Sequence, residues 1–167
     1  MSIVRFDREP RYFLRPGAND HNVIDTLLTR DMFTEPIRLD GVLLESPHVK
    51  AFADARAKLP DRTQVLVDPQ AYRFQRTTYE EHPSLFKLPY CPVDEVLTPE
   101  QFRDRQFTSK FVRAVLDVQD AIHATDFVAP GFYVDEPDSP WQSVNEALLN
   151  ETLRQAGGPV YATLCGS

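Results

Sequence analysis

Short apolar runs alternate with amphipathic stretches along most of the chain. Four apolar runs predict β-strands, at 42–45, 65–68, 127–134 and 160–165. Between them lie segments in which apolar residues recur with the spacing of a helix that buries one face. Near-continuous apolar strands that alternate with helices are typical of a parallel sheet covered on both faces. The pattern therefore predicts an α/β fold, built as a parallel βαβαβαβ unit.

Proline positions mark where the helices of this unit should begin. A Ser, Thr or Asp precedes Pro at four places: Ser46-Pro47, Asp68-Pro69, Thr98-Pro99 and Ser139-Pro140. The polar side chain can accept a hydrogen bond from the first turn, and Pro at the first helical position gives up no bond. Thr98 and Ser139 are each followed by Gln at the third helical position, which completes a capping box. We therefore expect helices from Ser46 to near Pro60, from Thr98 onward, and from Ser139 to Gly157.

Two of these helices carry apolar stripes that should be buried. The first stripe consists of Phe107, Phe111, Val115, Val118 and Ile122, and the second of Trp141, Val144, Leu148 and Leu153. Asn145 shares a helix face with Trp141, and we expect its amide to bond a neighbouring loop.

Two segments depart from the alternation. We expect residues 1–40 to form an N-terminal lead-in packed on the sheet, with residues 3–6 and 12–14 as strands, and residues 41–167 to form the main domain. Within that domain, about 70–97 has no convincing periodicity and is long for a loop of a compact domain. Most of its aromatic residues, such as Phe74, Phe86 and Tyr90, are expected to pin the loop on the core.

Two architectures accommodate a βαβαβαβ unit. A closed (β/α)8 barrel typically needs about 250 residues, so the 167 residues of this chain supply only part of one. The last apolar run is followed by Gly166-Ser167, which is typical of the start of another βα turn. We therefore expect the N-terminal half of a (β/α)8-type barrel, a fragment of a larger protein. An open four-stranded α/β sheet is the alternative.

Composition narrows the classes of function. The net charge of −7 argues against a protein whose main task is to grip nucleic acid. No apolar run is long enough to cross a membrane, and the charged N-terminus does not resemble a signal peptide. Glycine is scarce and no phosphate-binding loop motif occurs. The two cysteines, Cys91 and Cys165, form no C-x-x-C motif, so we expect a cytoplasmic protein.

The candidate catalytic residues follow the predicted strands, because ligands of parallel α/β folds bind beyond the carboxyl ends of the strands. Glu45 ends the first strand and Asp68 ends the second. Two carboxylates at one edge could divide acid and base roles, or hold a divalent cation such as Mg²⁺ through oxygen ligands. Capping alone would also explain Asp68, whereas Glu45 has no local structural task. Four histidines without H-x-x-x-H spacing make a zinc site improbable.

The candidate substrate-binding residues are Gln70, Arg73, Arg76 and Asp135. Arg73 follows Asp68 closely and could face the same pocket, where a guanidinium group would hold an anion. We therefore expect an enzyme that acts on a small polar, anionic substrate. The alternative is a non-catalytic interaction or regulatory module that self-associates or pairs with another chain or with a missing C-terminal half. Nucleic-acid binding would require a local basic patch in the long loop.

Overall fold

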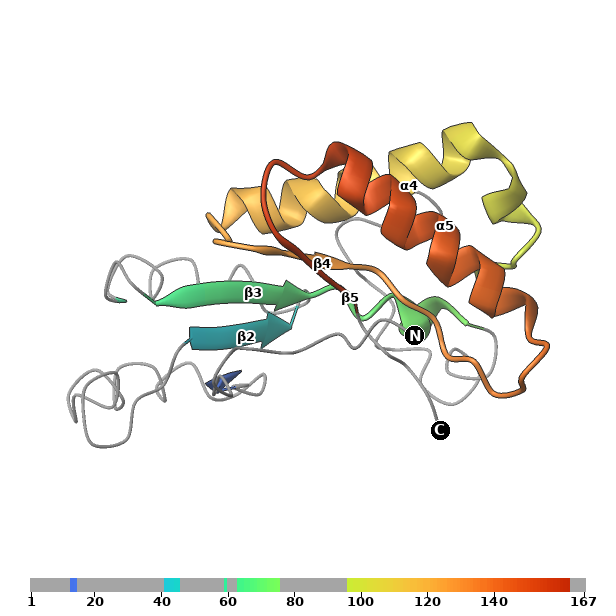
Figure 1. Ribbon diagram of the computed structural model, residues 1–167, viewed down its shortest axis with the longest axis horizontal. Helices are drawn as coiled ribbons and strands as arrows, with labels where there is room; N and C mark the ends of the chain where they lie inside the picture. Colours follow the sequence, from blue (N-terminus) through green and yellow to red (C-terminus); the bar gives the residue numbers. More distant parts are fainter. Residues whose placement is uncertain (1–12, 15–40, 46–58, 60–62, 76–95, 163–167) are drawn as a thin grey trace, which may run out of the picture.

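The computed structural model describes residues 13–14, 41–45, 59, 63–75 and 96–162, and these form an α/β structure with parallel strands (Figure 1). The strands are β1 (Phe13–Leu14), β2 (Gly41–Glu45), β3 (Gln64–Asp68), β4 (Phe127–Ala129) and β5 (Val160–Ala162). The α-helices are α4 (Arg105–Ala121) and α5 (Pro140–Gln155), and 3₁₀ helices cover Ala71–Phe74 and Gln101–Arg103. The predicted α/β class is confirmed.

The first three strands form one parallel sheet in chain order, β1-β2-β3. β1 pairs with the beginning of β2, so residues 13–14 of the predicted lead-in form an edge strand of the sheet itself. β2 and β3 pair along their whole length, from Gly41 opposite Gln64 to Glu45 opposite Asp68. Because both strands end at the same level, the residues that follow them start from one edge of the sheet.

The composition of β3 explains why it is a buried strand. Val65, Leu66 and Val67 are consecutive and all three are buried, as expected for a strand that is covered on both faces. Two of them are β-branched, and such stiff side chains pack well on a pleated surface. The continuous apolar run was therefore a correct signal for this strand.

β4 and β5 form a second parallel pair, with Phe127 opposite Val160 and Ala129 opposite Ala162. Several hydrogen bonds attach the entrance of β4 to β3, and one of them runs from Gln64 Nε2 to Asp126 Oδ2 at 3.0 Å. The backbone N–H of Thr125 donates to the carbonyl oxygen of Val65 at 3.0 Å, and the N–H of Val65 donates to Thr125 Oγ1 at 3.0 Å. The three-stranded sheet and the β4-β5 pair are thus joined by hydrogen bonds between backbone groups and between a side chain and the backbone.

The third predicted strand, 127–134, was too long. β4 ends at Ala129, and Val134 forms only an isolated bridge. The reason is Pro130, which has no N–H to donate to a strand ladder. Of the fourth predicted strand, 160–165, Val160–Ala162 form β5 and the rest lies outside the described residues.

α4 begins later than the sequence predicts. Thr98 opens a turn that leads into the 3₁₀ helix, and its N–H donates to Gln101 Oε1 at 2.7 Å, which is one half of the predicted capping box. The α-helix starts after Asp104, whose carboxylate accepts from the N–H of Gln106 at 2.8 Å. Asp is a stronger N-cap than Thr, and the extended backbone of Asp104 separates the two helical segments.

α5 begins where the sequence predicts, with Pro140 in its first turn. The Ser139 side chain forms no capping bond, so its backbone carbonyl, which accepts an N–H from the first turn, starts the helix. Val144 and Leu148 are buried as predicted, whereas Leu153 is 56% exposed. The prediction for Leu153 was wrong because it lies about 140° around the helix from Leu148.

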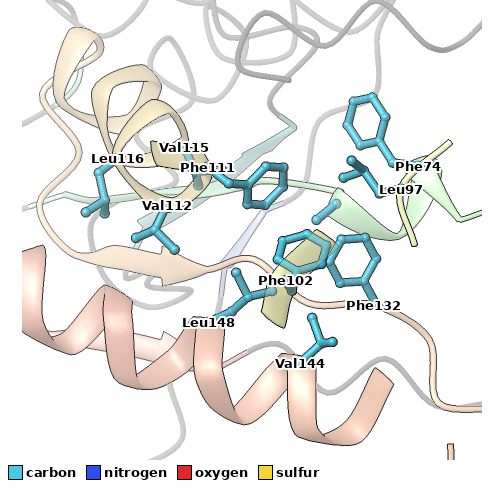
Figure 2. Close-up of a cluster of buried hydrophobic side chains, with 11 residues drawn as sticks. Phe74, Leu97, Phe102, Phe111, Val112, Val115, Leu116, Phe132, Val144 and Leu148 are labelled. Carbon is cyan, nitrogen blue, oxygen red and sulfur yellow. The ribbon is translucent and has the colours of Figure 1, made fainter. Parts of the chain in front are cut away.

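An aromatic core packs α4 and α5 against the loops that follow β3 and β4 (Figure 2). Phe102 lies at its centre, with ring centroids 5.4 Å from both Phe111 and Phe132. Trp141 stacks on Phe132 at 4.3 Å. The buried members are Ala71, Phe74, Leu97, Phe102, Phe111, Val112, Val115, Leu116, Phe132, Val144 and Leu148. The segments after the strands are therefore held by apolar packing.

The two ends of the predicted loop 70–97 meet in this core. The N–H of Leu97 donates to the carbonyl oxygen of Phe74 at 2.8 Å, and both side chains are buried. Phe74 therefore pins the loop, as predicted. Residues 76–95, which include Phe86 and Tyr90, lie outside the described residues.

Both α-helices lie on the same side of β3, β4 and β5 in Figure 1. The prediction of helices on both faces is therefore not met by the described part of the chain, which shows the order β3-α4-β4-α5-β5. The full βαβαβαβ unit is not shown, since the predicted helix 46–60 falls almost wholly outside the described residues. No helix in the described ranges is long and apolar enough to cross a membrane.

Candidate functional site

The candidate site is the edge of the sheet where β2 and β3 end, and we call it the rim. We define the rim by Glu45, Asp68, Gln70 and Arg73. Glu45 and Asp68 are the last residues of their strands, and their Cα atoms are register partners. Adjacent strands lie about 4.8 Å apart. The backbone therefore brings the two predicted catalytic positions together.

Asp68 has a structural task at the rim. Its Oδ1 accepts a hydrogen bond from the backbone N–H of Gln70 at 3.0 Å. This bond closes a turn over Pro69 and leads into the 3₁₀ helix Ala71–Phe74. Asp68 was predicted to cap a helix that begins at Pro69; instead it bonds the N–H of Gln70, which is itself the N-cap of the 3₁₀ helix. A catalytic role of Asp68 would come in addition to closing this turn.

Gln70 combines two unusual features. Its backbone is left-handed, with φ 53° and ψ 37°, a conformation that residues other than Gly, Asn and Asp seldom adopt. Its side chain is 1% exposed, and both Nε2 and Oε1 lack a hydrogen-bond partner in the described structure. Burying an amide without partners costs about 1–3 kcal/mol. The sequence had placed Gln70 among the substrate-binding residues.

The other predicted binding residues lie in different settings. Arg73 is half-buried in the 3₁₀ helix, and its N–H donates to the carbonyl oxygen of Gln70 at 3.1 Å. Asp135 is exposed and follows the isolated bridge at Val134. Arg76 falls outside the described residues. The backbone therefore joins Arg73 to the rim, and no contact between Asp135 and the rim is part of the described geometry.

A tyrosine pair connects the segment after β3 with the segment after β4. The rings of Tyr72 and Tyr133 lie with centroids 4.7 Å apart and planes tilted by 51°. Next to them, the Gln75 side chain binds both backbone groups of Tyr133. Tyr133 N–H donates to Gln75 Oε1 at 2.7 Å, and Gln75 Nε2 donates to the Tyr133 carbonyl at 3.0 Å. The chain beyond β4 is thereby fixed beside the chain beyond β3.

Two further side-chain amides bind the backbone in the same two-point manner. Gln119 accepts from the N–H of Val128 at 2.8 Å and donates to the Val128 carbonyl at 2.9 Å. Asn145 accepts from the N–H of Phe132 and donates to its carbonyl, both at 2.9 Å. We call these three contacts, from Gln75, Gln119 and Asn145, the amide clips.

The sequence predicted one of the three amide clips and missed the other two. Asn145 was predicted to bond a neighbouring loop, and it does so. Gln119 was missed, although a signal existed: it follows Val115 and Leu116 at helical spacing and therefore lies on the buried face. Gln75 was also missed, since no periodic pattern marks it.

The described residues contain no group of three or more His, Cys, Asp or Glu that could hold a metal ion. His123, at the end of α4, is exposed and has a φ of 54°. Mg²⁺ is nevertheless often held by one or two carboxylates with water completing its shell. The pair of positions that could supply carboxylates to a cation at the rim is Glu45 and Asp68, whose Cα atoms are register partners.

Comparison of the chain with protein-family models, with curated protein sequences and with solved structures gave no significant match. Chemistry at the rim must therefore be argued from its own residues. These are a pair of carboxylate positions, a buried amide and a guanidinium group on one turn. Such a set can bind a small polar molecule and move a proton on it.

Proposed function

We propose that this chain is a barrel-type α/β enzyme that acts on a small polar, anionic substrate at the rim. Glu45 and Asp68 exchange protons with the substrate as acid and base, and Arg73 holds its negative charge. Gln70 lines the same site. Arg76 and Asp135 are assigned to substrate binding on their sequence positions alone.

The register of β2 and β3 is the observation that carries this proposal. It pairs Glu45 with Asp68 at the carboxyl ends of two parallel strands. This is the edge at which parallel α/β folds bind their ligands. Two neighbouring carboxyl groups can take opposite protonation states, and one then acts as acid while the other acts as base.

The order of the strands supports a barrel-type sheet. Each pairing in the described part joins strands that are consecutive in the chain, and each is parallel. Both α-helices also lie on one side of the strands (Figure 1). A doubly wound sheet reverses its strand order and covers both faces, whereas a barrel adds strands in sequence with its helices on the outside. The open four-stranded sheet is the alternative.

The proposal is tested by binding measurements on charge-neutral variants. A panel of small carboxylates and phosphate monoesters is screened by ligand-observed NMR, each with and without Mg²⁺. Glu45→Gln and Asp68→Asn should each weaken binding of a panel member by tenfold or more. Asn at 68 keeps an oxygen for the N–H of Gln70, so the turn should survive.

Matched controls come from exposed acidic positions. Glu146→Gln on α5 and Asp138→Asn before it change charge equally, and both should bind as wild type does. Binding that depends on Mg²⁺ would assign the carboxylates to a cation, and binding without it would assign them to proton transfer. The proposal fails if no panel member binds, or if both rim variants bind like wild type.

A second candidate function is an interaction module that self-associates or binds another chain. The observation that favours it is Leu153, which is 56% exposed at the end of α5 and is the exposed large hydrophobic residue of the described part. Light scattering coupled to size exclusion compares wild type with Leu153→Glu. An assembly that this substitution dissociates would support the module, and a monomeric wild type would oppose it.

A further inference from the structure

Gln70 differs from the other buried glutamines of the described structure. Gln75 and Gln119 are buried and use both ends of the side-chain amide, one as donor and one as acceptor. Gln70 is equally buried, yet neither end of its amide has a partner in the described part of the chain. Buried amides in folded proteins are almost always hydrogen-bonded. We therefore expect a bound group to form the missing hydrogen bonds with the Gln70 amide.

The backbone of Gln70 leaves only the side chain to bind that group. Its N–H donates to Asp68 Oδ1 at 3.0 Å, and its carbonyl accepts from the N–H of Arg73 at 3.1 Å. These two bonds hold the residue in its left-handed conformation. The position of the amide is thus set by its neighbours on both sides, within the rim.

The amide clips indicate what kind of group fits such an amide. In each clip one side chain binds the N–H and the C=O of a single residue, which is the exchange made by a hydrogen-bonded pair of residues in a sheet. The same donor and acceptor edge is presented by any secondary amide with an adjacent carbonyl. A carboxylate offers only acceptors and would leave Gln70 Oε1 unpaired.

We infer that Gln70 recognises an amide group of the substrate, so that the substrate is a small N-acylated acid that carries both an amide and a carboxylate. This inference rests on the proposed function, because it places the ligand at the rim. The amide N–H of the substrate donates to Gln70 Oε1, and one oxygen of the adjacent carboxylate accepts from Gln70 Nε2, which reproduces the donor and acceptor edge of the clips. The other carboxylate oxygen lies toward Arg73. Glu45 and Asp68 stand next to each other at the ends of the paired strands beside this group.

The test uses three probes that separate the amide from the charge. N-acetylglycine carries both groups. Levulinate (4-oxopentanoate) has the same shape and charge, but a methylene replaces its N–H. N-methylacetamide has the amide without the charge. Binding is followed by ¹⁵N NMR on the full chain, in wild type and in Gln70→Met, which keeps the length of the side chain and removes both polar atoms.

Wild type should bind N-acetylglycine more tightly than levulinate by on the order of tenfold, since the missing N–H leaves Gln70 Oε1 unpaired. Gln70→Met should bind both probes with equal affinity. The side-chain amide signals that disappear in Gln70→Met should shift in wild type when N-acetylglycine is added. Gln75→Met, a clip residue, serves as the matched control and should keep the preference if it folds.

The outcomes distinguish this inference from the proposed function. Equal binding of N-acetylglycine and levulinate by wild type overturns the role of Gln70, shows that its amide holds water only, and leaves an anion site standing. A different outcome is that N-methylacetamide binds wild type as tightly as N-acetylglycine does, and that Gln70→Met abolishes this binding. That result supports the amide site and overturns the anionic substrate. Binding of none of the three probes overturns both.

Discussion

At the scale of single residues, side-chain amides carry much of the tertiary hydrogen bonding around β4. Gln119, Asn145 and Gln75 bind Val128, Phe132 and Tyr133 in turn, along the strand and the segment that continues from it. That segment has a proline and cannot form a regular ladder. The clips from Asn145 and Gln75 therefore stand in for strand pairing beyond Pro130, whereas the Gln119 clip binds Val128 within β4.

The side-chain amide of Gln119 is hydrogen-bonded in the described structure and that of Gln70 is not, so replacing each of them by Met should change the free energy of unfolding in opposite directions. Gln119→Met leaves the N–H and C=O of Val128 buried and unpaired, and should lower the free energy of unfolding by about 2–3 kcal/mol. Gln70→Met removes two unpaired buried atoms and should raise it by about 1 kcal/mol or leave it unchanged. Urea unfolding followed by circular dichroism measures both. A loss above about 1 kcal/mol in Gln70→Met would show that its amide is bonded in the free protein.

A second prediction concerns acid stability at the contact between α4 and α5. A hydrogen bond from Arg154 lowers the pKa of Glu151 to about 2, from an ordinary value of 4.5, while burial opposes this shift. The Glu151 side chain is only 17% exposed, and its neighbour Gln155 bonds the carbonyl of Ser109 on α4 at 3.0 Å. Because the folded pKa is lower, Glu151 stabilises the fold above about pH 4.5, and this contribution is lost as the pH falls toward about 2.

Glu151→Gln should therefore remove part of the acid sensitivity. Urea unfolding at about pH 6 and about pH 3 should show a smaller loss of stability in this variant than in wild type. Glu146→Gln, at an exposed position of the same helix, should lose as much as wild type. Equal losses in all three proteins would contradict the ion pair.

At the scale of elements, the two helices begin by different means, which gives a third prediction. Asp104→Ala removes a side-chain cap from α4 and should cost about 1 kcal/mol of unfolding free energy. Ser139→Ala should cost less than about 0.5 kcal/mol, because the Ser139 side chain makes no capping bond and Pro140 fixes the first turn. Thermal unfolding of both variants compares them. Equal costs would show that Ser139 caps α5 in solution.

The sequence predicts these elements well where one pattern dominates. The stripe of α4 and the apolar run of β3 were correct because burial decides both. The start of α4 was misplaced because two capping signals, at Thr98 and Asp104, lie within two turns and only tertiary packing selects between them. The strand predicted at 127–134 was too long, because the apolar residues continue past Pro130 while the hydrogen bonds of the strand do not.

At the scale of the whole molecule, Thr125 joins the three-stranded sheet to the β4-β5 pair, and this gives a fourth prediction. Thr125→Val keeps the size of the side chain but leaves the N–H of Val65 without its oxygen. We expect a loss of about 1–3 kcal/mol in the free energy of unfolding. Hydrogen exchange should accelerate at Val65 as well. Thr125→Ser keeps the oxygen and should restore slow exchange at that amide; failure to do so would show that the methyl group matters instead.

The candidate site was predictable only in part. Asp68 and Gln70 were found because a general rule places ligands after parallel strands. The sequence could not reveal the left-handed backbone of Gln70 or its lack of partners, since both depend on neighbours distant in the chain or on the turn closed by Asp68. The sequence also could not fix the position of Asp135, because that position depends on how far β4 extends.

The hydrogen bond between Leu97 and Phe74 has one more consequence. It makes Phe74 and Leu97 neighbours in space, although they lie far apart in the sequence. A short glycine linker can therefore replace residues 76–95 and still keep Gln75, whose side chain binds both backbone groups of Tyr133.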